Sequence, residues 1–296
     1  MPQRPFRQVD VFTREAFRGN PVAVVLDADG LTDEQMRRVA NWTNLSETTF
    51  VLPPTQPGAD YRLRIFTPQT ELPFAGHPTL GTAHALIEAG RITPQAGRLV
   101  QECATGLIQL TVTTQPGASP LIDFVLPEPG FTPLSDADVA ALAEALGAPV
   151  LTDPAPQHVR VGPVWTVVQL PSAQAVLALR PDFARLARLS GQDATTGVAV
   201  FGVWPQGASP GPAAIEVRAF APADGINEDP VCGSGNGAVA AFIRATGQTP
   251  AVGRQYLATQ GAVVGRSGEI HIAFEGDSVI RVGGQSLTCI EGQVTL

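Results

Sequence analysis

The chain has 296 residues, of which 44% are hydrophobic and 16% are charged, so it can bury a large core and is long enough to favour two lobes. Its net charge of -8 comes from 27 acidic and 19 basic residues without a basic run, so we expect no nucleic-acid binding. The basic residues are all arginines, which excludes a pyridoxal-phosphate lysine and a P-loop lysine.

The first part of the chain mixes predicted strands with two predicted helices. One helix is expected from Thr32 toward Trp42, because Thr32 and Gln35 form a capping-box pattern. A second helix is expected after Pro78, ending near Gly90. β-branched and aromatic residues between turn formers predict the strands RQVDVFT (7–13), AVVL (23–26), TTFVL (48–52) and YRLRIFT (61–67).

The middle of the chain contains the expected boundary between the lobes. Strand-like LVQECAT, LIQLTVTT and LIDFVLP are followed by the segment SDADVAALAEALG, a predicted helix capped by Ser135. Residues 116 to 135 include five prolines, and we place the lobes at 1–120 and 121–296. A strand from the C-terminus is a candidate to complete the first lobe.

The second half repeats this order, with strands near HVRVG and WTVVQL, a helical stretch near 174 to 189, and strands near VAVFGVW and IEVRAFA. RIFTP at 64–68 matches RAFAP at 218–222. After each match, PFAGHPTLG at 73–81 aligns with PVCGSGNGA at 230–238. The internal repeat therefore predicts two lobes related by pseudo-symmetry.

Each copy of the repeat places glycines at a helix start, where free N–H groups and the helix dipole favour a carboxylate or phosphate. Two copies predict a shared cleft for a small anionic metabolite. The structural alternative is that the glycines only permit tight turns. The G-x-G-x-x-A spacing from Gly233 lacks both the buried strand and the downstream acid of a dinucleotide site.

Cysteine spacing and the N-terminus indicate the compartment. Cys103, Cys232 and Cys289 lie far apart without C-x-x-C spacing, and MPQRPFRQ has no apolar signal region. We expect a cytoplasmic protein with reduced thiols, without a membrane role. The four histidines lack metal-binding spacing, so we predict neither a metal nor a cofactor.

Four ordered segments, FRGNPVAVV, LSETTFVL, RIFTPQTELPFAGHPTLG and EDPVCGSGNG, resemble the PhzF-like phenazine-biosynthesis family of the diaminopimelate epimerase-like superfamily. The resemblance runs from about residue 8 to the C-terminal strands. It implies an α+β fold of two pseudo-symmetric lobes, each a curved, mostly antiparallel sheet around a central helix, with the site between them. It also suggests a homodimer.

The resemblance implies roles for individual residues. Glu47 is the expected acid and base, because the second thiol of the superfamily's epimerases is replaced by Ala75 here. His77 and Asp229 are expected to orient substrate or relay a proton. The expected substrate-binding residues are Asn20, Gly76, Cys232, Gly233 and Ser234.

These residues also allow ordinary readings. Glu47 by itself resembles a solvated edge acid, Asp229 a turn acid, and Asn20 a residue that shapes a turn before proline. Cys232 is either a small core residue or a thiol of lowered pKa at a helix start.

The resemblance predicts a cofactor-independent isomerase that moves a proton within a small carboxylate-bearing metabolite. The namesake reaction isomerises trans-2,3-dihydro-3-hydroxyanthranilate. Two alternatives stay open: an amino- or hydroxy-acid epimerase that uses Cys232, and a non-catalytic binder of a metabolite carboxylate.

Overall fold

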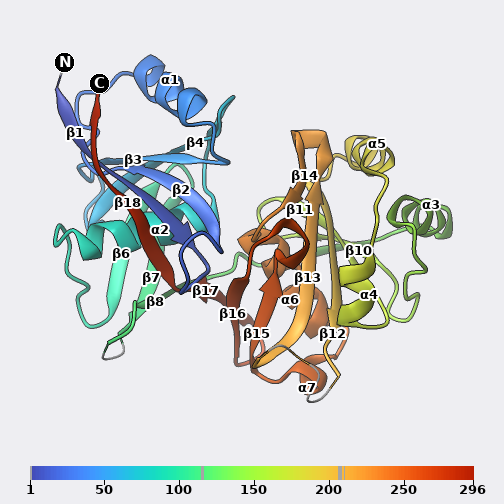
Figure 1. Cartoon of the computed structure of the whole chain (residues 1–296). Coiled ribbons are helices and arrows are strands. Elements are labelled where there is room, and N and C mark those ends of the chain that lie inside the picture. Colours follow the sequence, from blue (N-terminus) through green and yellow to red (C-terminus); the bar gives the residue numbers. More distant parts are fainter. Residues whose placement is uncertain (1, 115–116, 206–208, 210) are drawn as a thin grey trace. The chain divides into compact units, whose positions relative to one another are not determined.

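Two compact units make up the chain in the computed structural model, which describes residues 2–114, 117–205, 209 and 211–296. Unit 1 contains the residues up to Val125 together with Gly283–Leu296, and unit 2 is Leu126–Val282 (Figure 1). The strand β8 (Leu121–Val125), which follows the expected boundary at residue 120, pairs antiparallel with β7 (Gly106–Thr113) and so belongs to unit 1.

The sheet of unit 1 is organised around its first strand. β1 (Gln3–Val11) pairs antiparallel with β2 (Asn20–Val25) and also with the C-terminal strand β18 (Ser286–Thr295). The β2–β3 and β4–β6 pairs are parallel, and the other strand pairs of this sheet are antiparallel. These further strands are β3 (Thr48–Leu52), β4 (Tyr61–Phe66), β5 (Glu71–Leu72) and β6 (Arg98–Cys103).

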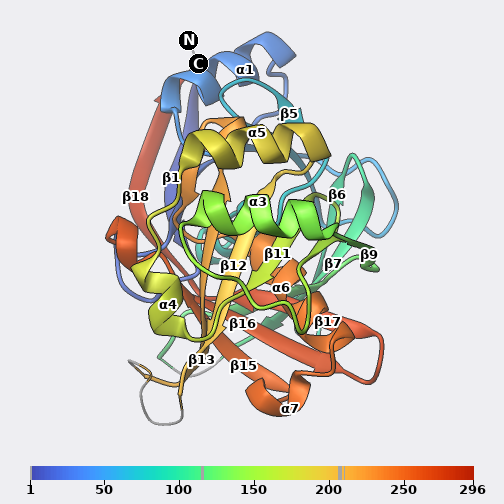
Figure 2. The ribbon, with the colours of Figure 1, turned by 90° about the vertical axis from the view of Figure 1, so that its right-hand side faces the viewer.

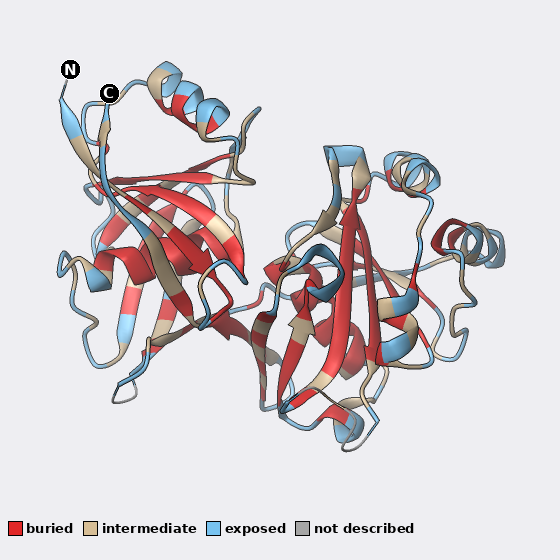
Figure 3. Cartoon of the chain, viewed as in Figure 1, coloured by how far each residue is buried: buried red, intermediate tan, exposed pale blue. Residues whose placement is uncertain are grey.

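A buried helix, α2 (Gly76–Glu88), is the centre of unit 1. Every residue from His77 to Leu86 is buried, and the helix packs against β1, β2, β3, β8 and β18 (Figure 3). The approach to the sheet is close, because a Cβ on Gly81 would lie 2.5 Å from Val22 Cγ1. Such burial on all sides is typical of a helix enclosed by other elements.

The helix α1 (Asp33–Thr43) covers a separate part of the same unit. Its predicted capping box is confirmed, since Thr32 Oγ1 accepts from the N–H of Gln35 and Gln35 Oε1 accepts from the N–H of Thr32. Met36 on its apolar face packs into a cluster that includes Phe50 and Phe66.

Unit 2 repeats the strand order of unit 1. β11–β12 and β13–β15 are its parallel pairs, corresponding to β2–β3 and β4–β6, and β9 lies beside β10 as β18 lies beside β1. Its strands are β9 (Gly130–Pro133), β10 (Gln157–Arg160), β11 (Val164–Gln169), β12 (Gly197–Val203), β13 (Ala213–Ala221), β14 (Ile226–Asp229), β15 (Gln255–Gln260) and β16 (Gly268–Glu275). β17 (Val279–Gly284) leads from this unit back to unit 1.

The helix α6 (Gly233–Ala245) occupies the place of α2 in this second sheet. It is buried along most of its length and packs against β10, β11, β12 and β16. The helices α3 (Asp136–Leu146), α4 (Ala173–Ala178) and α5 (Phe183–Asp193) cover the other face of the sheet, as Figure 2 shows. The predicted α+β fold of two pseudo-symmetric sheets around central helices is thus confirmed.

The helical stretch expected near 174 to 189 is two helices rather than one. Leu179 ends α4 in an extended conformation, with φ −53° and ψ 141°. Pro181 then follows, and proline has no N–H to continue a helix while it pushes the residue before it toward extended backbone. Asp182 caps the new helix by accepting from the N–H of Arg185.

The two copies of the repeated RxFxP motif fold alike. In unit 1, the guanidinium of Arg64 lies 5.1 Å from the ring centroid of Phe66 and forms a two-bond ion pair with Glu71. A third nitrogen donates to Asp33 on α1. This copy of the motif therefore joins β4, β5 and α1 at a partly exposed site.

In unit 2, the guanidinium of Arg218 lies 5.0 Å from the ring centroid of Phe220 and forms a two-bond ion pair with Glu228. Its third nitrogen donates to the carbonyls of Val176 and Leu179 at the end of α4. The Arg218 and Glu228 side chains are only 3% and 6% exposed. The same motif is thus buried in unit 2, where each charge depends on its partner.

Among the described residues, no helix is long and apolar enough to cross a membrane. The predicted cytoplasmic location and the predicted homodimer remain predictions.

Because breaking a buried ion pair leaves an uncompensated charge, we expect Glu228→Gln to lower the free energy of unfolding by about 3 kcal/mol. The matched change Glu71→Gln should cost less than about 1 kcal/mol, since that pair is partly solvated. Urea unfolding of both variants against wild type measures the difference. Equal losses would contradict the distinction between the two copies.

Candidate active site

One group of candidate site residues lies at the start of α2, in unit 1. The chain turns at Pro73 and enters the helix through Ala75, an extended residue whose side chain offers no cap. The amides of the first helical turn are therefore left for other acceptors. Gly76 has a packing role, because a Cβ there would lie 2.9 Å from the ring of Phe124.

Glu47 and His77 come together at this helix start. Glu47 immediately precedes β3, and its Oε2 lies 3.4 Å from Nε2 of His77. The side chains are 15% and 8% exposed, respectively. Two segments that are 30 positions apart in the sequence thus form one acid and imidazole pair.

Burial lowers the pKa of His77 to about 3, although a hydrogen bond to the Pro21 carbonyl opposes this effect. The imidazole is therefore neutral near pH 7 and carries a single N–H. The Nε2 atom faces Glu47 and makes no other hydrogen bond.

Asn20 lies beside this pair in the fold. It is the first residue of β2, is fully buried, and directly precedes the Pro21 that holds the His77 ring. The structure thus gathers Asn20, Glu47, Gly76 and His77 around the start of α2. Their roles in binding and catalysis remain predictions.

A second group of candidate site residues lies at the start of α6, in unit 2. Asp229 ends β14, and its Oδ1 accepts from the N–H of Val231 at 3.0 Å. Burial raises the pKa of Asp229 to about 6, against the lowering effects of the Val231 and Cys232 hydrogen bonds. Asp229 thus has a pKa suited to exchanging protons near neutral pH.

Cys232 is the N-cap of α6, and its Sγ accepts from the N–H of Gly235 at 3.3 Å. Burial and the neighbouring Asp229 raise the pKa of this thiol well above its ordinary value. The lowered pKa that a helix start can produce is therefore outweighed here by desolvation. Cys232 is a protonated thiol at neutral pH.

Ser234 follows the helix's first residue, Gly233, and is oriented by Trp165. The indole Nε1 of Trp165 donates to Ser234 Oγ at 3.0 Å, and an indole N–H can only donate. The Ser234 hydroxyl must therefore direct its own hydrogen elsewhere. One neighbour is Cys232 Sγ, 3.6 Å away, and a ligand carboxylate is a stronger acceptor.

Sequence reasoning missed two residues that contact this second group, Trp165 and Gln260. Both are buried and act from strands that are distant in the sequence, β11 and β15. Gln260 bonds to the main chain on both sides of the Asp229 turn. No local pattern marks either residue, because their contacts depend on the pairing of the strands.

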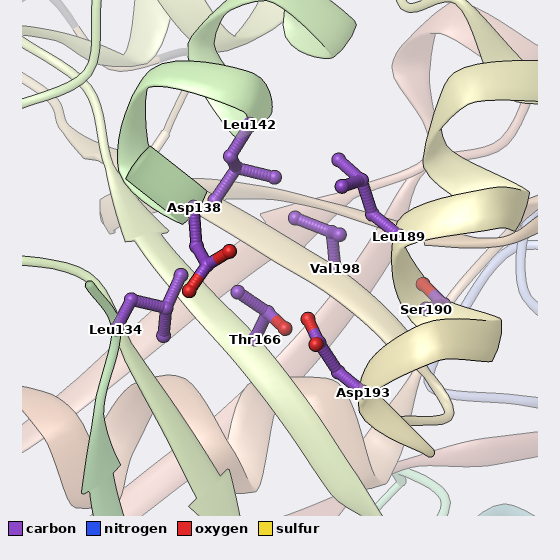
Figure 4. Close-up of a pocket in the computed structure, with 8 residues that line it drawn as sticks. All are labelled: Leu134, Asp138, Leu142, Thr166, Leu189, Ser190, Asp193 and Val198. Atoms are coloured by element: carbon purple, nitrogen blue, oxygen red, sulfur yellow. The ribbon is translucent and has the colours of Figure 1, made fainter. Parts of the chain in front are cut away.

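Two hollows in unit 2 lie apart from these residues. The one in Figure 4 has a volume of about 10 Å³, which is room for about one water. The other measures about 270 Å³ and lies along the Arg218–Glu228 pair. Neither of these two hollows is lined by a predicted site residue, so neither is assigned to the candidate site.

Among the described residues, no three His, Cys, Asp or Glu side chains form a group that could hold a metal ion. The expectation that the protein uses neither metal nor cofactor remains a prediction.

Comparison with known proteins identifies the family. Residues 9–292 match the phenazine biosynthesis-like protein family, PhzC-PhzF. The chain belongs to this family. It is also 36% identical over 292 residues to the Pseudomonas aeruginosa protein named trans-2,3-dihydro-3-hydroxyanthranilate isomerase, covering 97% of this chain and 98% of that one.

Other relatives of this PhzF-type isomerase cover the whole chain. A Schizosaccharomyces pombe protein named Antisense-enhancing sequence 1 is 42% identical over 301 residues, covering 99% of both chains. The crystal structure of a Bacillus anthracis phenazine biosynthesis protein of the PhzF family superposes with a TM-score of 0.87 over 100% of both chains, at 23% identity. That structure supports the fold of the PhzF-type chain.

The buried, neutral state of His77 in this PhzF-type isomerase predicts a pH effect on stability. Unfolding releases the ring to its ordinary pKa of 6.5, so between pH 6.5 and about 3 the unfolded chain binds a proton that the folded chain does not. Wild type should lose stability relative to His77→Gln as the pH falls below 6.5, by roughly 1.4 kcal/mol per pH unit. Urea unfolding at several pH values measures this difference, and parallel profiles would contradict it.

Proposed function

We propose that this protein is a cofactor-independent isomerase that moves a proton within a small carboxylate-bearing metabolite, with Glu47 as the general acid and base. The observation that carries the proposal is the 3.4 Å approach of Glu47 Oε2 to Nε2 of the buried His77. Because His77 is neutral, it does not hold Glu47 as a permanent ion pair.

The proposed reaction is a proton transfer between two positions of the substrate. The Glu47 carboxylate removes a proton from a carbon, the bonding electrons of that C–H move into the adjoining double-bond system, and Glu47 returns the proton at its far end. Atoms and charge balance without an oxidant or a second substrate. His77 would accept a hydrogen bond from protonated Glu47 and so stabilise the state in which Glu47 holds the substrate's proton.

The start of α6 supplies the groups that we propose bind the substrate. Ser234 and the amide of Gly233 would donate to the carboxylate, as helix N-termini do for anions. Asp229, whose pKa near 6 permits either protonation state, would bind an amine or hydroxyl of the substrate and could relay its proton.

The proposed substrate to test first is trans-2,3-dihydro-3-hydroxyanthranilate, the compound in the name of the Pseudomonas aeruginosa relative. It carries a carboxylate, an amine and a hydroxyl, which match the groups assigned to Ser234 and Asp229.

The epimerase alternative pairs Cys232 with Glu47, so that Cys232 delivers a proton as a thiol in one direction and removes one as a thiolate in the other. The raised pKa of Cys232 and its bond from the Gly235 N–H disfavour the thiolate. Alkylation of Cys232 distinguishes the two, since only the epimerase predicts that the chemistry itself depends on the thiol. A non-catalytic binder would instead be stabilised thermally by a metabolite without forming product.

Replacement of the acid and base should abolish turnover. We expect Glu47→Gln to lower kcat by roughly 100-fold to 10,000-fold, because the amide can neither take nor give the proton. Proton NMR of the substrate in D₂O follows product formation and deuterium uptake in wild type and variant. Glu34→Gln, on the exposed surface of α1, is the control and should behave as wild type. Retained turnover in Glu47→Gln would refute the role.

The orientation of Ser234 predicts a binding effect for Trp165. Trp165→Phe keeps a buried aromatic ring but removes the N–H that donates to Ser234. One lost neutral hydrogen bond is worth about 1 kcal/mol, so KM should rise about fivefold with little change in kcat. Steady-state kinetics measure both constants. An unchanged KM would show that Ser234 does not depend on Trp165 for substrate binding.

A further inference from the structure

Gln260 forms hydrogen bonds to the main chain on both sides of the turn that follows Asp229. Its Nε2 donates to the Asp229 carbonyl at 2.8 Å, and its Oε1 accepts from the Cys232 N–H at 3.1 Å. The same Oε1 accepts from Nδ2 of Asn236 on α6 at 2.7 Å. One side-chain amide, 1% exposed, thus joins the end of β14 to the first turn of α6.

The main-chain N–H groups of this turn all have a partner or are absent. Pro230 has no N–H, the Val231 N–H donates to Asp229 Oδ1, and the Cys232 N–H donates to Gln260. The Asp229 carboxylate is therefore held from within a turn whose two ends Gln260 fixes. A side chain that fixes the backbone of a reacting group limits the positions which that group can sample.

Unit 1 provides an internal comparison for this arrangement. Tyr61 pairs with Gln101 as Ile215 pairs with Ala258, which places Cys103 at the position equivalent to Gln260. Cys103 does not bridge the turn before α2, because its Sγ contacts Thr105 and the carbonyl of Gly106.

The equivalent turn therefore forms in unit 1 without a glutamine at this position. A tight turn into a central helix does not by itself require the bridge. The bridge occurs in the copy that carries Asp229, whereas the equivalent residue in unit 1 is Leu72. This difference points to a role connected with the carboxylate.

We propose that Gln260 is a positioning residue that holds Asp229 and the first turn of α6 in the geometry needed for the isomerase reaction. This inference rests on the proposed function. Gln260 acts through Asp229 and Cys232 and does not itself touch the substrate.

The test is Gln260→Met in the full chain, which keeps the length of the side chain and removes its amide. We expect kcat for trans-2,3-dihydro-3-hydroxyanthranilate to fall roughly 100-fold, with a smaller change in KM, since a displaced catalytic group mainly affects the chemical step. Gln101→Met is the matched control, because Gln101 is an equally buried glutamine that bonds Tyr61 and Thr79 in unit 1. It should lose comparable stability and retain kcat.

A second readout needs no substrate. Carbon-13 NMR of aspartate-labelled protein, assigned with Asp229→Asn, gives the titration midpoint of Asp229. In Gln260→Met we expect this midpoint to fall from about 6 toward the ordinary 3.8, because the loosened turn admits water beside Glu228 and Cys232, the groups that face the carboxyl. It should stay unchanged in Gln101→Met.

The outcomes separate the inference from the proposed function. If wild type does not convert the substrate, the proposed substrate fails, and a shifted Asp229 midpoint in Gln260→Met still supports the positioning role. An unshifted midpoint in Gln260→Met would overturn that role, whether or not the substrate is converted. Equal losses of kcat in Gln260→Met and Gln101→Met would overturn it too, since they would indicate general destabilisation.

Discussion

Burial of most of a helix within the sheet of each unit is the constraint on which the rest of the structure depends. The starts of α2 and α6 are enclosed with the helices, so the polar residues there leave water when the chain folds. Desolvation then determines the protonation of these residues. It lowers the pKa of His77 so that the ring is neutral, raises the pKa of Asp229 to about 6, and raises the pKa of Cys232 so that the thiol stays protonated. The same enclosure demands small residues, such as Gly81, where the helix meets the strands.

Enclosure also makes an unpaired polar group costly, and in each unit a glutamine from the strand that follows the central helix bonds a polar side chain of that helix. Gln101 bonds Thr79 on α2, and Gln260 bonds Asn236 on α6. Such bonds cost little when complete and much when broken, because an unpaired polar group inside a protein loses its hydration. Each of these bonds therefore joins the central helix of its unit to the strand that follows it in the chain.

The two units share one backbone framework but differ in the side chains that it carries. The RxFxP arginine stacks on its phenylalanine and pairs with a glutamate in both, but the pair is buried only in unit 2. At the helix starts, Ala75 and His77 of one copy correspond to Cys232 and Ser234 of the other. A repeated backbone with different side chains can place an acid and imidazole pair in one unit and hydroxyl and carboxyl groups in the other.

Much of this was determined by the sequence alone. The turn residues and the Thr32 capping box depend on neighbours within a few positions, so local patterns predicted strands, helices and the starts of α2 and α6. The internal repeat predicted two related lobes, and the family resemblance implied a sheet around a central helix in each. The break between α4 and α5 is also local, at Pro181, but the helical pattern of the residues on both sides led to the prediction of a single helical stretch.

Tertiary structure decided what depends on contacts between distant segments. Strand pairing brought Glu47 to His77, Trp165 to Ser234 and Gln260 to the Asp229 turn. It also decided the protonation of His77 and of the Cys232 thiol, where the sequence allowed either a lowered or an ordinary pKa. Solvent exposure of a side chain is a property of the packed fold, and the pKa shifts at this site follow chiefly from exposure, so the sequence could name these residues but could not determine their charge.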